Sequence, residues 1–312
     1  MRPTPALAAP RSVAEGPEVR SYYGRSVLKR PVWHWYVPAY FFTGGVAAGS
    51  ALLAAGGRLT GDHRLARRCL LASSGAVAVS GVLLVADLGR PRRFLNMLRV
   101  AKITSPMSVG TWLLTAFGTA VSAATLSEVT GVGRRTGRAA EGVAAILAPG
   151  MATYTAVLIA DTAVPAWHDA RHELPFVFAG GAAASSGAIA VLVAPGTAAG
   201  RRLAVGGAVV ELVAAEVLQQ RLGDVAQVYR RGRTRSLRRL ALGATATGAA
   251  LLAVPGRRRA GQVTGALILL VGAAAERFTV FQAGVESAVD PAFTIAAQRR
   301  RLDARARTRE NG

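Results

Sequence analysis

The sequence predicts an all-α membrane protein, a bundle of about eight transmembrane helices with both termini in the cytoplasm. Hydrophobic residues make up 51% of the chain and charged residues only 18%, and the mean hydropathy is +0.32. Eight stretches of about 17–25 nearly uncharged residues are each long enough to cross a hydrocarbon layer as a helix. Basic residues gather in the connections between them, as is typical of polytopic membrane proteins.

In chain order, the predicted spans are 33–56, 69–88, 107–128, 142–164, 176–195, 203–222, 240–256 and 262–284. The stretch 240–256 is short and ends in Val-Pro-Gly, so seven helices remain an alternative. Residues 1–30 contain four prolines and six basic side chains without a signal-peptide core, which predicts a flexible cytoplasmic arm. Residues 31–288 are expected to form the membrane domain, and 289–312 a basic cytoplasmic tail.

The connections predict the orientation. Alternate segments on the side of the N-terminal arm carry 25 of the 38 Lys and Arg residues: 1–30, 89–106, 165–175, 221–239 and 299–309. The connections on the other side carry 12: 57–68, 129–141, 196–202 and 257–261. Because cytoplasmic loops are enriched in basic residues, both termini are expected in the cytoplasm of a multi-pass protein of the cytoplasmic membrane.

Composition also excludes several functions. The net charge of +21 would suggest nucleic acid in a soluble protein, but here the basic residues act as topology signals and contact lipid headgroups. Cys69 is the sole cysteine and the four histidines lie at span ends or in loops, so no haem, iron–sulfur cluster or metal is expected on this chain. The sequence has no G-x-x-x-x-G-K-[ST] loop, which argues against an ATP-driven pump.

Ionisable side chains inside spans are costly and are therefore functional candidates. They are Asp87, Asp161, Glu211, Glu216, Glu276 and Arg277, with His34 at the first interface. Glu211 and Glu216 point about 140° apart around their helix, whereas Tyr154 and Asp161 share a helix face about 10.5 Å apart. Structural alternatives remain open: Arg277 pairs with a carboxylate to hold the bundle together, Asp87 ends a helix, and Tyr154 bonds a neighbouring backbone. An aromatic belt at the membrane surface is predicted near the first interface, formed by Trp33, Trp35, Tyr36 and Tyr40.

Three segments together resemble one family: Trp33-His-Trp-Tyr-Val-Pro-Ala-Tyr-Phe-Phe-Thr-Gly-Gly-Val-Ala-Ala-Gly49, Asp87-Leu-Gly-Arg-Pro-Arg-Arg-Phe94 and Ser105-Pro-Met-Ser-Val-Gly-Thr-Trp112. They are similar to the NrfD/PsrC family of quinone-reactive membrane subunits. The likeness continues through Tyr154-Thr-Ala-Val-Leu158, Pro165-Ala-Trp167, Arg277-Phe278 and Ala283-Gly284, from about residue 20 to 290.

The resemblance implies an eight-helix bundle without a cofactor of its own. It also implies a ferredoxin-like iron–sulfur partner, a molybdenum or tungsten catalytic subunit, and menaquinone or ubiquinone as exchangeable substrate. The family's quinone-contacting positions fall at His34 and Tyr154. Asp87 and Arg90, in the loop expected to line the partner-facing surface, complete the expected quinone set.

From the residues we expect Tyr154 and His34 to donate hydrogen bonds to quinone oxygens and Asp161 to relay protons. Glu216, Glu276 and Arg277 are expected to form a proton path or a buried ion pair. The basic side chains of Arg90, Arg92 and Arg93 are expected to dock the iron–sulfur partner. A formate dehydrogenase-type assembly is the favoured hypothesis. A secondary transporter and a passive membrane tether are the alternatives.

Overall fold

The computed structural model describes residues 28–89, 92–99, 101–254, 256, 258–290 and 292–293, and the described part is helical without strands. The N-terminal arm before residue 28, Arg90 and most of the C-terminal tail lie outside the described residues. The elements are α1 (Tyr36–Leu59), α2 (His63–Asp87), α3 (Arg92–Leu98), α4 (Pro106–Thr130), α5 (Arg134–Ala160), α6 (Pro165–His168), α7 (Leu174–Val193), α8 (Ala198–Arg221), the 3-10 helix η1 (Gly223–Arg230), α9 (Gly232–Ala253) and α10 (Arg259–Val289).

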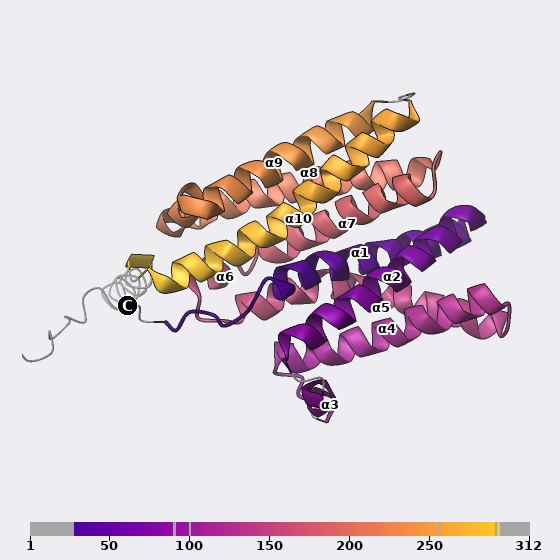
Figure 1. Ribbon diagram of the computed structural model, residues 1–312, viewed down its shortest axis with the longest axis horizontal. Coiled ribbons are helices and arrows are strands. Elements are labelled where there is room, and N and C mark those ends of the chain that lie inside the picture. Colours follow the sequence, from indigo (N-terminus) through magenta and orange to yellow (C-terminus); the bar gives the residue numbers. More distant parts are fainter. Residues whose placement is uncertain are drawn as a thin grey trace, which may run out of the picture.

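The long helices run side by side and alternate in direction (Figure 1). One end of the bundle, called end A here, carries residues 28–35, α3, α6, η1 and the end of α10. The opposite end, end B, carries the connections at 60–62, 131–133 and 194–197, and residues 254, 256 and 258 between α9 and α10. The predicted all-α bundle is therefore confirmed.

Within the described part of the chain, seven helices are long and apolar enough to cross a membrane: α1, α2, α4, α5, α7, α8 and α10. The predicted span 240–256 corresponds to α9, which is a 22-residue helix but is not among these seven. Its first eight residues include Arg233, Arg235, Arg238 and Arg239, and these lower its hydropathy. Nevertheless α9 packs along α10 and lies beside the other long helices (Figure 1).

The helices extend beyond the apolar stretches that predicted them, because a helix continues through charged residues once they reach the water layer. Thus α2 begins at His63, where Asp62 caps it by accepting from the Leu65 amide at 2.9 Å. In contrast, α5 ends at Ala160, four residues before the predicted limit of 164. Pro165 holds Val164 in an extended conformation and begins α6.

Small residues set the distance between neighbouring helices. A Cβ atom added at Gly180 of α7 would lie 2.5 Å from the amide nitrogen of Glu211 on α8. One added at Gly248 of α9 would lie 2.6 Å from the amide nitrogen of Leu269 on α10. Only glycine permits such backbone contact, which is a common mode of packing between membrane helices.

Candidate functional site

A cavity of about 150 Å³ lies near end A, between α1, α2, α4 and α5, with α3 at its edge. Such a volume is about that of a protein cavity that holds one benzene molecule. Its lining is apolar and aromatic apart from a few polar side chains. The residues that line it are Trp33, Val37, Tyr40, Phe41, Leu84, Asp87, Leu88, Met97, Met107, Gly110, Thr111, Tyr154 and Leu158.

Tyr154 enters this cavity from α5, and its ring lies against the backbone of α4 at Gly110. A Cβ atom at Gly110 would collide with the ring, so the glycine makes room for the tyrosine. The position of Gly110 is set by the start of α4, where Ser105 caps the helix and Pro106 occupies its first turn. The first turns of α4 thus position Gly110 so that the ring of Tyr154 from α5 fits against it.

Tyr40 of α1 is the partner of Tyr154. The two rings are edge-to-face, with centroids 6.5 Å apart and planes at 67°. Tyr40 is 5% exposed, and its hydroxyl oxygen has no hydrogen-bond partner among the described residues. A buried hydroxyl without a partner is costly in a membrane protein. The aromatic residues near the first interface predicted a belt position for Tyr40. The spacing of Val37, Tyr40 and Phe41 puts all three on one helix face, and this pattern is the signal that could have predicted a cavity position.

A carboxylate and an imidazole stand beside the tyrosines. Asp87 is the last residue of α2, which Gly89 ends with a φ of 68°, a backbone conformation that favours glycine. The Oδ1 atom of Asp87 is buried, has no hydrogen-bond partner among the described residues, and lies 3.8 Å from His34 Nδ1. The His34 side chain is 71% exposed. The pair therefore connects the cavity to the surface at end A.

Aromatic stacking holds the segment before α1 in place. The ring of Trp33 stacks on that of Trp167 with centroids 5.6 Å apart, and Trp167 is fully buried. The indole nitrogen of Trp167 donates to the carbonyl of Val280 at 2.8 Å, and its ring packs on Gly284. The cavity wall at Trp33 is consequently tied to α10 through Trp167 of α6.

Asp161 lies outside this cavity. It follows the last residue of α5 as the helix cap and its side chain is exposed. The carboxylate that shares the cavity with Tyr154 is therefore Asp87 and not Asp161. Arg92 and Arg93 are exposed on α3, where Arg93 Nη1 donates to the carbonyl of Leu88 at 3.3 Å.

A second group of ionisable residues is buried in the half of the bundle formed by α7, α8 and α10. Arg277 donates to the carbonyl of Phe178 at 2.7 Å, and its guanidinium lies 4.1 Å from the centre of the Phe178 ring. Glu276 and Glu211 are also buried, and neither carboxylate oxygen of Glu211 has a hydrogen-bond partner among the described residues.

Glu216 does not belong to that buried group. Its side chain is 59% exposed and pairs with Arg238 of α9 at 3.5 Å. The expected separation of Glu211 from Glu216 around their helix is thereby confirmed, and it is Glu211 that faces the interior with Arg277. Among the described residues no group of three His, Cys, Asp or Glu side chains is placed to hold a metal ion.

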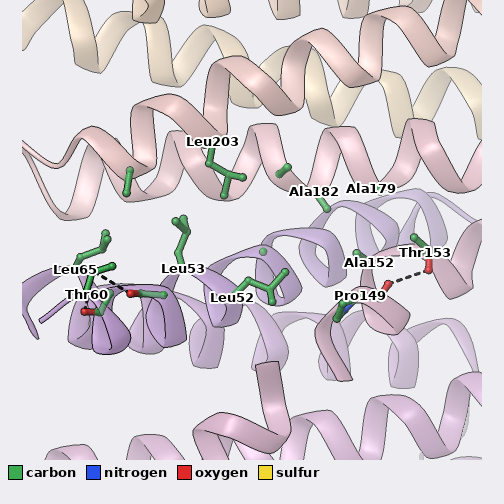
Figure 2. A pocket seen from close by; sticks show the side chains of 15 residues that line it. Leu52, Leu53, Thr60, Leu65, Pro149, Ala152, Thr153, Ala179, Ala182 and Leu203 are labelled. Carbon is green, nitrogen blue, oxygen red and sulfur yellow. Dashed lines mark hydrogen bonds between the residues drawn. The ribbon is translucent and has the colours of Figure 1, made fainter. Parts of the chain in front are cut away.

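A larger apolar cavity of about 460 Å³ lies between α1, α5, α7 and α8. Figure 2 shows its polar side chains, Thr60 and Thr153, turned back to their own helices. Their hydroxyls donate to the carbonyls of Gly56 and Pro149, both at 2.9 Å. This cavity consequently offers no free side-chain donor, and size alone does not make it the candidate site.

The family model for polysulphide reductase NrfD matches residues 26–212, which is more than half of the chain. The chain belongs to this family. It is an integral, multi-pass membrane protein, and NrfD proteins are membrane subunits of quinone-reactive oxidoreductases. No curated protein matches the chain.

The matched region contains every residue that lines the Tyr154 cavity, together with His34. It ends within α8, one residue after Glu211, so the NrfD match does not extend to Arg277-Phe278 or Ala283-Gly284. The cavity at end A thus lies wholly within the NrfD match, and two of its lining residues, Tyr40 and Asp87, carry a buried polar atom without a hydrogen-bond partner among the described residues.

Proposed function

We propose that this NrfD protein exchanges electrons between an iron–sulfur partner docked at end A and the membrane quinone pool, with the quinone ring in the Tyr154 cavity. The observation that carries the proposal is the cavity itself. It has the volume of one ring, aromatic walls, two tyrosines and the Asp87–His34 pair at its edge. The isoprenoid tail lies outside it, among the apolar helix surfaces.

The residues suit the chemistry. Reducing a quinone to a quinol takes two electrons from the iron–sulfur partner and two protons, which bind the two ring oxygens. A phenol hydroxyl can donate a hydrogen bond to a ring oxygen as negative charge develops there. The Thr111 hydroxyl already uses its proton within α4, since it donates to the carbonyl of Met107 at 2.9 Å. Tyr154 and Tyr40 are therefore the assigned donors, and Asp87 with His34 supplies protons from the surface.

The partner surface follows from charge and position. The exposed Arg92 and Arg93 of α3 lie at end A, on the side of the bundle where the cavity opens towards His34. With Arg90 of the same loop, they suit an acidic protein surface. The distribution of basic residues assigns end A and both termini to the cytoplasm. The complex then has a cytoplasmic catalytic subunit, and we propose a formate dehydrogenase-type molybdenum or tungsten enzyme.

The buried residues of the other half-bundle are proposed to conduct protons. Glu211 and Glu276 lie near Arg277, whose neighbour Phe178 has its ring centroid 5.6 Å from that of Phe41 in the cavity wall, with the two planes tilted by 52°. Ionisable groups placed at such depth are expected to serve a proton path. In sealed vesicles, Glu211→Gln should abolish proton translocation linked to quinone turnover. Unchanged translocation would leave Arg277 and its neighbours as a structural polar cluster.

The deciding experiment fills the cavity. Leu158 lines it, whereas Val157, the preceding residue, is 48% exposed on the outside of α5. In the purified complex, Leu158→Trp should abolish quinone reduction and leave dye reduction by the soluble subunits intact, while Val157→Trp should change neither. A passive tether predicts normal quinone activity in both variants, and that result would refute the proposal.

A further inference from the structure

A polar cavity of about 290 Å³ lies at end B, lined by residues around the α1–α2 and α4–α5 connections. Figure 1 shows these connections at the end of the bundle opposite α3. The cavity is formed by the end of α1, the start of α2, the end of α4 and the first turns of α5. None of its residues lines the Tyr154 cavity, so the proposed quinone chemistry does not account for it.

Arg58 lines this cavity and joins three helices, its own α1 to α4 and α5. Its Nε atom donates to Glu141 Oε2 of α5 at 3.1 Å, and its Nη2 atom donates to Glu128 Oε2 of α4 at 2.9 Å. The Glu141 side chain is only 6% exposed, and its second oxygen, Oε1, is buried without a hydrogen-bond partner among the described residues. Because a buried carboxylate oxygen without a hydrogen bond is unfavourable, we expect a donor from outside the chain to bind Oε1.

Two more arginines line the cavity, Arg134 and Arg138, one turn apart on α5. Within the described part of the chain, neither has a carboxylate within 4.0 Å, because both lining carboxylates bind Arg58. The α5 N-terminus adds its own partial positive charge, since Gly133 provides no side-chain cap. The cavity is therefore lined by two arginines that could bind an anion and by Glu141, whose Oε1 is an acceptor without a partner among the described residues.

Three exposed apolar side chains adjoin lining residues in the sequence and are called the rim here. Leu59, Val129 and Val132 are 89%, 61% and 74% exposed, and they follow the lining residues Arg58, Glu128 and Gly131 in the chain. Exposed aliphatic side chains at the end of a membrane-spanning bundle meet the boundary between headgroups and acyl chains. A small soluble anion would leave this rim and the Glu141 oxygen unused.

We propose that this cavity binds the headgroup of a phospholipid. The phosphate lies on Arg134 and Arg138, and a headgroup hydrogen-bond donor, an ammonium or a hydroxyl, contacts Glu141 Oε1. The acyl chains cover Leu59, Val129 and Val132. Phosphatidylethanolamine and phosphatidylglycerol meet these requirements, whereas phosphatidylcholine has the phosphate but no donor. The proposal does not depend on the quinone site.

The test is lipid retention by the full chain in its purified complex, measured by native mass spectrometry with dioleoyl phosphatidylethanolamine, phosphatidylglycerol or phosphatidylcholine. The two donor-bearing lipids should be retained at least about tenfold more tightly than phosphatidylcholine. The double change Arg134→Gln and Arg138→Gln should remove that retention. Arg135→Gln, which takes an equal charge from the same turn outside the cavity lining, should leave it intact.

Two further arms separate the contributions. Glu141→Gln keeps an oxygen for Arg58 but removes the charge, so the preference for phosphatidylethanolamine over phosphatidylcholine should fall. Inorganic phosphate at millimolar concentration should not displace the lipid. Equal retention of all three lipids, or an unchanged preference in the Arg134/Arg138 double variant, would overturn the proposal. Full displacement by phosphate would overturn it too, and would make the ligand a free anion.

Discussion

The rings of Tyr40 and Tyr154 meet edge-to-face, 6.5 Å between centroids, although 114 positions separate them in the chain. The contact joins α1 to α5 within the cavity wall, and it brings the buried Tyr40 hydroxyl, which has no hydrogen-bond partner among the described residues, next to Tyr154. The hydroxyls of Tyr40 and Tyr154, which come from different helices, can thus both contact the ring of one bound quinone. The first two predictions separate their contributions.

Tyr154→Phe keeps the ring packing against Gly110 and removes one hydroxyl. Because a lost buried hydrogen bond costs about 1–3 kcal/mol, quinone turnover should fall on the order of tenfold or more. Dye reduction by the soluble subunits should be unchanged, because dyes accept electrons upstream of the membrane. Tyr36→Phe is the control, since Tyr36 is at the same end of α1 but does not line the cavity. Full quinone activity in Tyr154→Phe would make this residue a packing residue.

Tyr40→Phe should separate stability from activity. Its hydroxyl lacks a partner among the described residues, so removing it should leave the thermal stability of the quinone-free protein unchanged or raise the free energy of unfolding by about 1 kcal/mol. The same change should raise the quinone KM. Thermal melts of delipidated protein and quinone titrations measure the two effects. A marked loss of stability would mean that the hydroxyl is bonded in the protein.

Asp161 is near Tyr154 along the chain, whereas Asp87 shares the cavity with it. Asp87→Asn should slow quinone turnover on the order of tenfold or more, because Asp87 lines the cavity and contacts His34, whereas Asp161→Asn should have a smaller effect from its exposed position. The dependence of the steady-state rate on pH, measured between pH 6 and 8, should change in shape for Asp87→Asn and not for Asp161→Asn. The reverse ranking would return the proton relay to Asp161.

Topology can be read from two exposed positions at opposite ends. Lys102 precedes α4 at end A, and Arg258 precedes α10 at end B. In a Cys69→Ala background, a membrane-impermeant thiol reagent applied to intact cells should label Arg258→Cys and spare Lys102→Cys, because the basic connections place end A inside. Labelling of Lys102→Cys alone would invert the bundle and move the catalytic partner outside.

Charge reversal tests the docking surface. Arg92→Glu with Arg93→Glu should release the soluble subunits from membranes without unfolding the bundle, because both side chains are exposed on α3. Including Arg90→Glu should strengthen the release. Arg202→Glu, which changes an exposed arginine at end B, should have no effect. Co-purification of all subunits with the reversed α3 would assign these arginines to lipid contact.

Local sequence was sufficient for the fold class. Hydropathy over some twenty residues predicts a membrane helix because burial in lipid depends on the segment itself, and the family segments near residues 33, 87 and 105 are contiguous in the chain. The helix boundaries were less well predicted. Caps and prolines decide them, as Asp62 does for α2 and Pro165 does after α5.

Only part of the candidate site could be predicted from the sequence. Periodicity tells which residues share a helix face, but it does not tell which neighbouring helix that face contacts. It separated Glu211 from Glu216, yet it could not choose the one that faces Arg277. It paired Tyr154 with Asp161 on one helix, whereas packing paired Tyr154 with Tyr40 and Asp87 on two others. Contacts between helices depend on close approach at positions such as Gly110, and tertiary structure alone decides them.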